Sequence, residues 1–194
     1  MNFLRIHEAV LFAAKVHDGQ MRKADPVPFV THPFTAALYI QPALVREGFT
    51  PKEQENIVIA IILHDVWEDT DTTLSEIEER FGQRIMTLVE GASEADKSKS
   101  WLDRKTATIE KVTEAPLSLR YVILADKLHN VTSLLDTKMK YGEKIWDSFK
   151  ANKESQFWYY SSMYKALVEG LHPVPPLFLE LKYQIETVFS ESIQ

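Results

Sequence analysis

The chain has 194 residues, enough for one domain with a sizeable hydrophobic core. Its net charge of -6 argues mildly against nucleic acid as a partner, and the absence of cysteine excludes disulfides, thiolate metal sites and cysteine nucleophiles. No apolar run approaches the roughly 18 residues that span a bilayer. His7 and Glu8 interrupt the N-terminal apolar stretch, which is wrong for a signal peptide, so we expect a cytoplasmic protein.

Apolar residues at helical spacing predict helices along the first half of the chain. An ordered loop with two prolines, residues 20–31, interrupts the pattern. The first two predicted helices run from Phe3 to Val16 and from Pro33 to about Gly48. The third begins at Pro51 and contains the run IVIAIILHDVWED. A fourth contains LSEIEERFG after a cap at Thr72 or Thr73, and a fifth begins at about Gln83. The run IVIAIIL is apolar nearly all round, so we expect it to form a buried core helix.

A polar connection over residues 93–100 separates this half from a second helical half. Helices are predicted there over 101–114, 117–138, 143–170, with a break near Ala151-Asn152, and 176–190. The sequence shows no strand-type alternation and no internal repeat. It therefore predicts one all-α domain over residues 1–194, a helical bundle with central helices.

Two histidines and two aspartates are placed as metal ligands would be. His64 and Asp65 directly follow the apolar run AIIL, and Asp126 follows VILA. Charged groups at the end of buried runs are costly unless they are paired or coordinated. With His32, which precedes Pro33, they give a mixed nitrogen and oxygen set that suits a divalent ion such as Mn²⁺, Fe²⁺ or Zn²⁺. Any one of them alone is more often a surface charge or a packed ring.

Carboxylates and an amide follow these ligands at helical spacing. Glu68 and Asp69 lie three and four residues after Asp65, so on a helix they would share its face. Carboxylates beside a metal ion can orient and deprotonate its bound water. Asn130 lies four residues after Asp126, where its amide could hydrogen-bond a substrate. The pattern indicates metal-assisted hydrolysis, with a metal site between the central helices of the bundle.

Several longer phrases resemble one family of enzymes. They are HDGQMRK, PFVTHPFTAAL, ILHDVWEDTDTT, FGQRIMTLVEGAS, WLDRK, LADKLHNVTSLL and QFWYYSSMYKAL. The chain is similar to the hydrolase domain of the RelA/SpoT proteins, and more closely to the stand-alone small alarmone hydrolases. The resemblance covers about residues 5–170, and the helix predicted at 176–190 lies beyond it.

The resemblance implies hydrolysis of ppGpp or pppGpp at the 3′-diphosphate, which gives pyrophosphate and GDP or GTP. It implies one metal ion, usually Mn²⁺, although Fe²⁺, Zn²⁺ and Co²⁺ also suit the ligands. The implied roles are metal binding by His32, His64, Asp65 and Asp126, water activation by Glu68 and Asp69, and substrate binding by Arg22, Lys23 and Asn130.

Two departures from the family pattern bear on the substrate. Asp25 stands in the loop expected to receive phosphates, and Trp67 stands inside the HDVWED phrase. Two alternatives therefore stay open. One is a metal phosphohydrolase for another nucleotide, such as ppApp, NADPH or a nucleoside mono- or triphosphate. The other is a non-catalytic nucleotide sensor. It predicts that a metal ligand or a water-activating residue is missing, whereas the sequence contains all of them. The aromatic segment 157–164 leaves a homodimer open.

Overall fold

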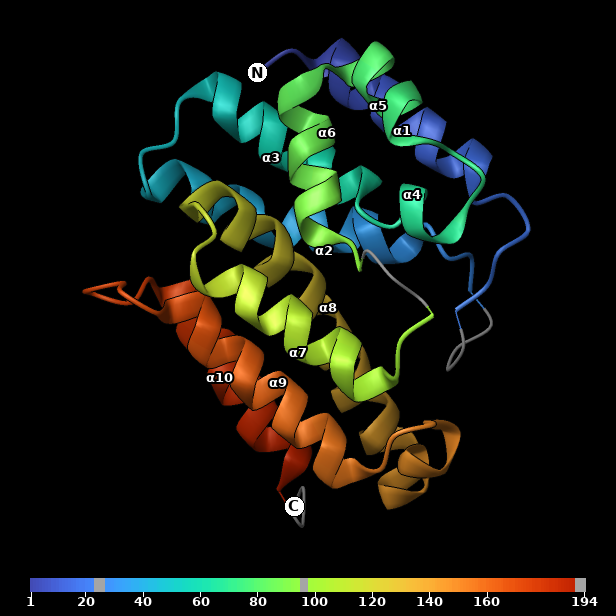
Figure 1. Ribbon diagram of the computed structural model, residues 1–194, viewed down its shortest axis with the longest axis vertical. Helices are drawn as coiled ribbons and strands as arrows, with labels where there is room; N and C mark the ends of the chain where they lie inside the picture. The colour runs from blue at the N-terminus through green and yellow to red at the C-terminus, as the bar shows by residue number, and fades with distance from the viewer. Residues whose placement is uncertain (23–26, 95–97, 191–194) are drawn as a thin grey trace. The chain divides into compact units, whose positions relative to one another are not determined.

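A computed structural model describes residues 1–22, 27–94 and 98–190. The described part is α-helical, as predicted, and contains no β-strand, only an isolated bridge between Met21 and Pro28 (Figure 1). It has no helix with the length and apolar character that crossing a membrane requires. The chain forms two compact units, Met1–Ala95 with Pro116–Asp126, and Asp96–Ala115 with Lys127–Gln194. The prediction of a single domain stays a prediction.

The first unit is built around one buried helix. Its helices are α1 (Phe3–Val16), α2 (Thr31–Arg46), α3 (Pro51–Leu63), α4 (Val66–Asp69), α5 (Leu74–Phe81), α6 (Gln83–Ala92) and the first part of α8 (Leu117–Tyr141). Helix α3 packs against α1, α2 and α6 (Figure 1). Every side chain from Ile57 to Leu63 is at most 3% exposed, so the predicted core helix is confirmed.

Short polar side chains fix where these helices begin. The Thr50 hydroxyl accepts the backbone N–H of Glu53 at 3.2 Å, and the Thr73 hydroxyl accepts that of Glu76 at 3.2 Å. Thr73, rather than Thr72, is therefore the cap of α5. Helix α2 begins at Thr31 rather than at the predicted Pro33, so His32 lies inside its first turn. A proline is tolerated there because first-turn N–H groups have no partner within the helix.

The helix predicted through HDVWED is interrupted at His64 and Asp65, so that prediction was wrong. Helix α3 ends at Leu63, and a separate single turn, α4, begins at Val66. The His64 Nδ1 atom lies 2.7 Å from the carbonyl oxygen of Ile61. In a continuous helix this carbonyl would accept the N–H of Asp65. The imidazole competes for that acceptor, which explains why the helix stops here.

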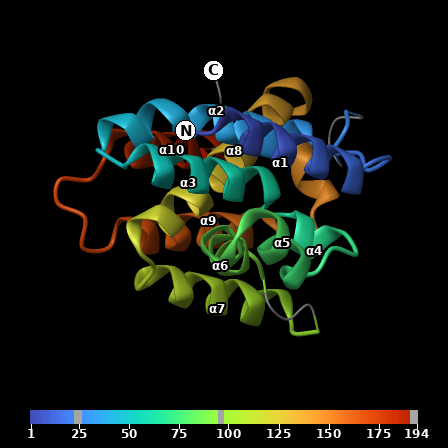
Figure 2. The same ribbon diagram turned by 90° about the horizontal axis from the view of Figure 1, so that it is seen from above.

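The second unit is a set of packed helices with an aromatic cluster. Its elements are α7 (Trp101–Thr113), the rest of α8, the 3₁₀ helix η1 (Gly142–Ser148), α9 (Lys153–Val168) and α10 (Pro176–Phe189). Helix α9 lies between α7 and α10 (Figure 2). Trp146 stacks on Phe189 with ring centroids 5.0 Å apart. The predicted break before α9 is confirmed, since Asn152 caps this helix by accepting the N–H of Ser155 at 3.0 Å.

Candidate metal centre

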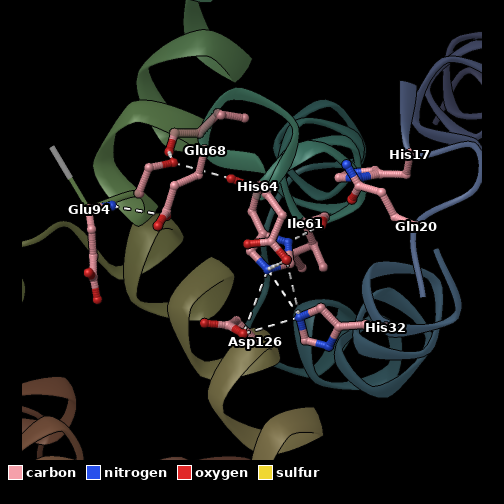
Figure 3. Close-up of polar contacts among 11 residues, drawn as sticks. His17, Gln20, His32, Ile61, His64, Glu68, Glu94 and Asp126 are labelled. Carbon is pink, nitrogen blue, oxygen red and sulfur yellow. Dashed lines mark hydrogen bonds and ion pairs between the residues drawn. The ribbon is translucent and has the colours of Figure 1, made fainter. Parts of the chain in front are cut away.

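Four side chains from four elements of the first unit converge on one point. His32 comes from the first turn of α2, His64 from the end of α3, and Asp126 from α8. Asp65 is the N-cap residue of α4. Both histidines are buried, whereas both carboxylates keep partial exposure. Figure 3 shows the two imidazoles and the Asp126 carboxylate pointing toward one another.

The ligand atoms of these residues lie within a narrow range of distances. The Nε2 atoms of His32 and His64 are 3.3 Å apart. Asp126 Oδ1 lies 3.2 Å from His32 Nε2 and 3.7 Å from His64 Nε2. Asp65 Oδ2 lies 3.2 Å from His64 Nε2 and 3.6 Å from His32 Nε2. The structure therefore brings His32, His64 and Asp126 together, with their donor atoms within 4.8 Å of one another. Asp65 joins them through its contacts with the two imidazoles.

The hydrogen bond of His64 fixes which of its nitrogens faces the cluster. A carbonyl oxygen only accepts, so Nδ1 must carry the proton that it donates to Ile61. In the neutral imidazole, Nε2 then presents a lone pair to the carboxylates and to His32. An outer hydrogen bond of this kind orients a histidine ligand and sets its tautomer.

Burial and the neighbouring charges shift the pKa values of the cluster in different directions. Burial lowers the pKa of His64, but the carboxylates of Asp65 and Asp126 outweigh it and raise the pKa well above its usual value. Burial dominates at His32 and lowers its pKa. Burial would raise the pKa of Asp65, yet the adjacent His64 charge and hydrogen bond hold it below its usual value. The shifts at His64 and Asp65 thus have one physical cause, the attraction between the imidazole and the neighbouring carboxylates.

A divalent ion fits this arrangement. Donor atoms about 2.0–2.2 Å from a common ion, at the angles of tetrahedral or octahedral coordination, lie about 3.0–3.5 Å from one another. The observed separations of 3.2–3.7 Å are close to that range. One donor atom each of His32, His64 and Asp126 lies within 4.8 Å of the others. The chemistry of the set, two imidazoles and two carboxylates, agrees with a divalent transition ion.

The two carboxylates predicted to activate water lie on α4, directly after the ligands. Glu68 is half-buried, and its Oε2 accepts the backbone N–H of Glu94 at 3.2 Å (Figure 3). Asp69 is exposed, and its carbonyl accepts the side-chain amide of Gln20 at 2.8 Å. The single turn α4 is thus connected to segments before α2 and after α6.

Sequence reasoning missed the residues that make these connections. Gln20 and Glu94 contact α4, and the Ser93 hydroxyl lies 3.2 Å from the carbonyl oxygen of His64. Ser93 and Glu94 stood in a segment read only as a polar connection, and Gln20 in one read as a loop. The pairs are separated by 26 to 49 positions, so no spacing rule within one helix could have found them.

The predicted substrate-binding residues are described only in part. The backbone N–H of Arg22 donates to the carbonyl of Val27 at 3.0 Å, and the Arg22 side chain is half-buried. Lys23 and Asp25 lie outside the described residues. Trp67 is half-buried on α4. Asn130 is half-buried one turn beyond Asp126 along α8, in the part of this helix that belongs to the second unit.

The chain matches a known family, the HD domain, over residues 9–156. It belongs to the HD-domain family. This HD-domain protein is 39% identical over 131 residues to the human guanosine-3′,5′-bis(diphosphate) 3′-pyrophosphohydrolase MESH1. The aligned region covers 66% of this chain and 68% of MESH1. It is 33% identical over 136 residues to the bifunctional (p)ppGpp synthase/hydrolase SpoT of Escherichia coli (strain K12). That aligned region covers 67% of this chain and 18% of SpoT.

A solved structure extends the similarity to the fold of nearly the whole HD-domain protein. It is that of a metazoan ortholog of SpoT, described as hydrolysing ppGpp and having a role in starvation responses. It superimposes with a TM-score of 0.75 at 26% sequence identity and covers 94% of both chains. The predicted resemblance to the RelA/SpoT hydrolases and the predicted all-α fold are confirmed.

Proposed function

We propose that this HD-domain protein removes the 3′-diphosphate of ppGpp and pppGpp as pyrophosphate and leaves GDP or GTP. The observation that carries the proposal is the pair of imidazoles of His32 and His64, whose Nε2 atoms lie 3.3 Å apart, with carboxylate oxygens of Asp65 and Asp126 3.2–3.7 Å from them. The similarity to MESH1, whose name states this activity, supports the choice of substrate. In this reaction water adds to the phosphorus attached to the ribose, and the bond from that phosphorus to the 3′ oxygen breaks.

We propose that the four residues hold one divalent metal ion, with Mn²⁺ preferred over Fe²⁺, Zn²⁺ and Co²⁺. When bound, such an ion lowers the pKa of a coordinated water and stabilises negative charge on a phosphoryl oxygen. The buried His64 supplies its Nε2 lone pair because Nδ1 is engaged with Ile61. Asp65 and Asp126 supply the negative charge that favours a cation at this place.

Glu68 and Asp69 are proposed to act on the attacking water. Each carboxylate can accept a proton from that water, and the bond from the Glu94 N–H restrains Glu68. Arg22 and Lys23 are proposed to neutralise the phosphates, because Arg grips phosphate with two parallel hydrogen bonds and Lys supplies a compact charge. The Asn130 amide is proposed to hydrogen-bond the nucleoside. The proton balance closes when the 3′ oxygen receives a proton as pyrophosphate leaves.

We propose that residues 1–194 act as one hydrolase domain in the cytoplasm, with a small nucleotide as the substrate rather than nucleic acid. A homodimer through the aromatic segment 157–164 is a further proposal, which the molecular mass in solution tests. The proposed chemistry at the metal site does not depend on the cellular location or on the homodimer.

The direct test is turnover of ppGpp with Mn²⁺, compared with ppApp, GTP and NADPH, with the products identified by mass. We expect GDP and pyrophosphate from ppGpp, loss of turnover with a chelator, and recovery with Mn²⁺. In ¹⁸O-labelled water the label should appear in pyrophosphate and not in GDP. The reason is that water attacks the phosphorus and the bond between this phosphorus and the 3′ oxygen breaks. Turnover of another nucleotide but not of ppGpp would show that ppGpp is not the substrate. Metal binding without any turnover would instead favour the nucleotide sensor.

A further inference from the structure

A buried histidine and a glutamine form two consecutive hydrogen bonds near the proposed metal site. His17 ends α1 and is 2% exposed, and its Nδ1 lies 2.9 Å from Gln20 Oε1 (Figure 3). The Gln20 Nε2 donates to the carbonyl of Asp69 at 2.8 Å. Because the Asp69 carbonyl only accepts, the Gln20 oxygen must face His17. His17 Nδ1 therefore carries the proton and donates to it.

Helix α4, which accepts the hydrogen bond from Gln20, is too short to be stable without contacts from other segments. Helix α4 has four residues, and a single helical turn is unstable on its own. Its carbonyls have no partner in a continuing helix, so they depend on other donors. The Thr70 hydroxyl donates to the Val66 carbonyl at 2.6 Å, and Gln20 donates to the carbonyl of Asp69. These bonds stand where a longer helix would supply its own.

The same glutamine also anchors the loop that carries Arg22. The Gln20 carbonyl accepts the N–H of Phe29 at 2.9 Å. The Phe29 ring lies between two imidazoles, with centroids 4.8 Å from His17 and 6.0 Å from the proposed ligand His32. Through its backbone Gln20 thus holds the base of the loop, and through its side chain it holds the end of α4.

We propose that Gln20 is a positioning residue that fixes α4, and with it Glu68 and Asp69, relative to the Arg22 loop, and that His17 orients the Gln20 amide. The proposal rests on the proposed function, in which the carboxylates of α4 act on the attacking water. Neither His17 nor Gln20 belongs to the proposed ligand or substrate-binding set. Their contribution is the placement of groups that do.

Core packing alone does not account for His17. Its Nε2 is buried and has no hydrogen-bond partner among the residues that the structure describes. A buried nitrogen without a partner is costly, and an apolar ring could pack against Phe29 without that cost. What an apolar ring could not do is donate a proton to Gln20. The Nδ1–H is thus the feature that distinguishes histidine at this position.

The test measures steady-state kinetics of Gln20→Leu, with Gln41→Leu on the exposed surface of α2 as the matched control. We expect kcat on ppGpp to fall about tenfold or more in Gln20→Leu, with KM within about twofold, because misplaced catalytic groups lower the rate of the chemical step. Mn²⁺ affinity should not change, and Gln41→Leu should behave as the wild type. If Gln20→Leu fails to fold, Gln20→Glu serves, since its carboxylate still accepts from His17 but cannot donate to Asp69.

A double-mutant cycle tests the role of His17. His17→Phe should lower kcat less than Gln20→Leu does, without lowering the melting temperature. Added to Gln20→Leu it should lower kcat no further, because the amide that it orients is already gone. Equal losses in both backgrounds would overturn the assignment of His17.

Hydrogen exchange keeps the proposal separate from the proposed function. Gln20→Leu should speed the exchange of amides in residues 66–70, whether or not ppGpp is the substrate. Faster exchange in a protein whose wild type does not turn over ppGpp would overturn the proposed function and uphold the positioning role. Unchanged exchange with unchanged kcat in a folded Gln20→Leu protein would overturn the positioning role.

Discussion

Helices α3 and α4 are neighbours in the chain but differ in what holds them. Helix α3 has 13 residues, a capping threonine and seven consecutive side chains that are at most 3% exposed. Helix α4 has four residues and takes hydrogen bonds from Gln20, Thr70 and the backbone of Glu94. The proposed ligand His64 thus ends a rigid core element, whereas the proposed water-activating carboxylates lie on a turn that other segments hold.

The sharpest test of this comparison separates metal binding from catalysis. Asp65→Ala should lose the ion and the activity together, with turnover reduced by about 10³-fold or more, because one of the four proposed donors is removed. Metal content and Mn²⁺ affinity should be measured beside turnover. Asp71→Ala, an exposed aspartate just beyond α4, is the control and should keep both. An Asp65→Ala protein with full metal content would remove Asp65 from the ligand set.

On α4 the same measurements should give the opposite pattern. Glu68→Gln keeps the size of the side chain but cannot take a proton, so we expect turnover to fall about 10²–10⁴-fold with the metal retained. The control is Glu79→Gln on the exposed surface of α5. Full activity in Glu68→Gln would show that another group activates the water.

Stability should depend on α3 much more than on α4. Ile59→Ala should lower the free energy of unfolding by about 2–5 kcal/mol, because Ile59 is fully buried and the smaller side chain leaves a cavity. Thr70→Val removes the bonds of this hydroxyl to Val66 and Thr72 and should cost only about 1–2 kcal/mol. Denaturant unfolding measures both values. Equal losses in the two variants would contradict the distinction between a core helix and a supported turn.

Glu55, in the first turns of α3, makes a pH-dependent contribution to the free energy of unfolding. Glu55 is buried and binds Arg5, Lys52 at 2.8 Å and the N–H of Asn2 at 2.5 Å. Burial would raise the pKa of Glu55, but these partners lower it from 4.5 to about 2. The carboxylate therefore stabilises the fold above pH 4.5, and this stabilisation is lost as the pH falls from 4.5 to about 2.

Glu55→Gln should remove this contribution, about 2 kcal/mol near neutral pH. The difference in unfolding free energy between wild type and variant should shrink as the pH falls through that window. Denaturant unfolding at several pH values measures it. A difference that stays constant down to pH 2 would show that the ion pairs of Glu55 add nothing to stability.

The elements of the fold follow from local patterns in the sequence, and the site follows only in part. Apolar spacing and caps predict α1 and α3 because helix formation depends on neighbours within one or two turns. The break at His64 was not predictable from spacing, since it comes from a side chain that competes with the backbone for the Ile61 carbonyl. The bonds of Gln20 and Ser93 join distant segments, so the fold itself is needed to find them.

The ligand cluster has a consequence for the stability of the first unit. His32 and Asp126 come from distant parts of the chain, and His64 and Asp65 lie between them. An ion held by all four would act as a cross-link that closes a long loop, and it would bind the folded chain in preference to the unfolded one. Each tenfold rise in free metal above its dissociation constant would then add about 1.4 kcal/mol to the free energy of unfolding. The melting temperature of this protein would thus report how much metal is available to it.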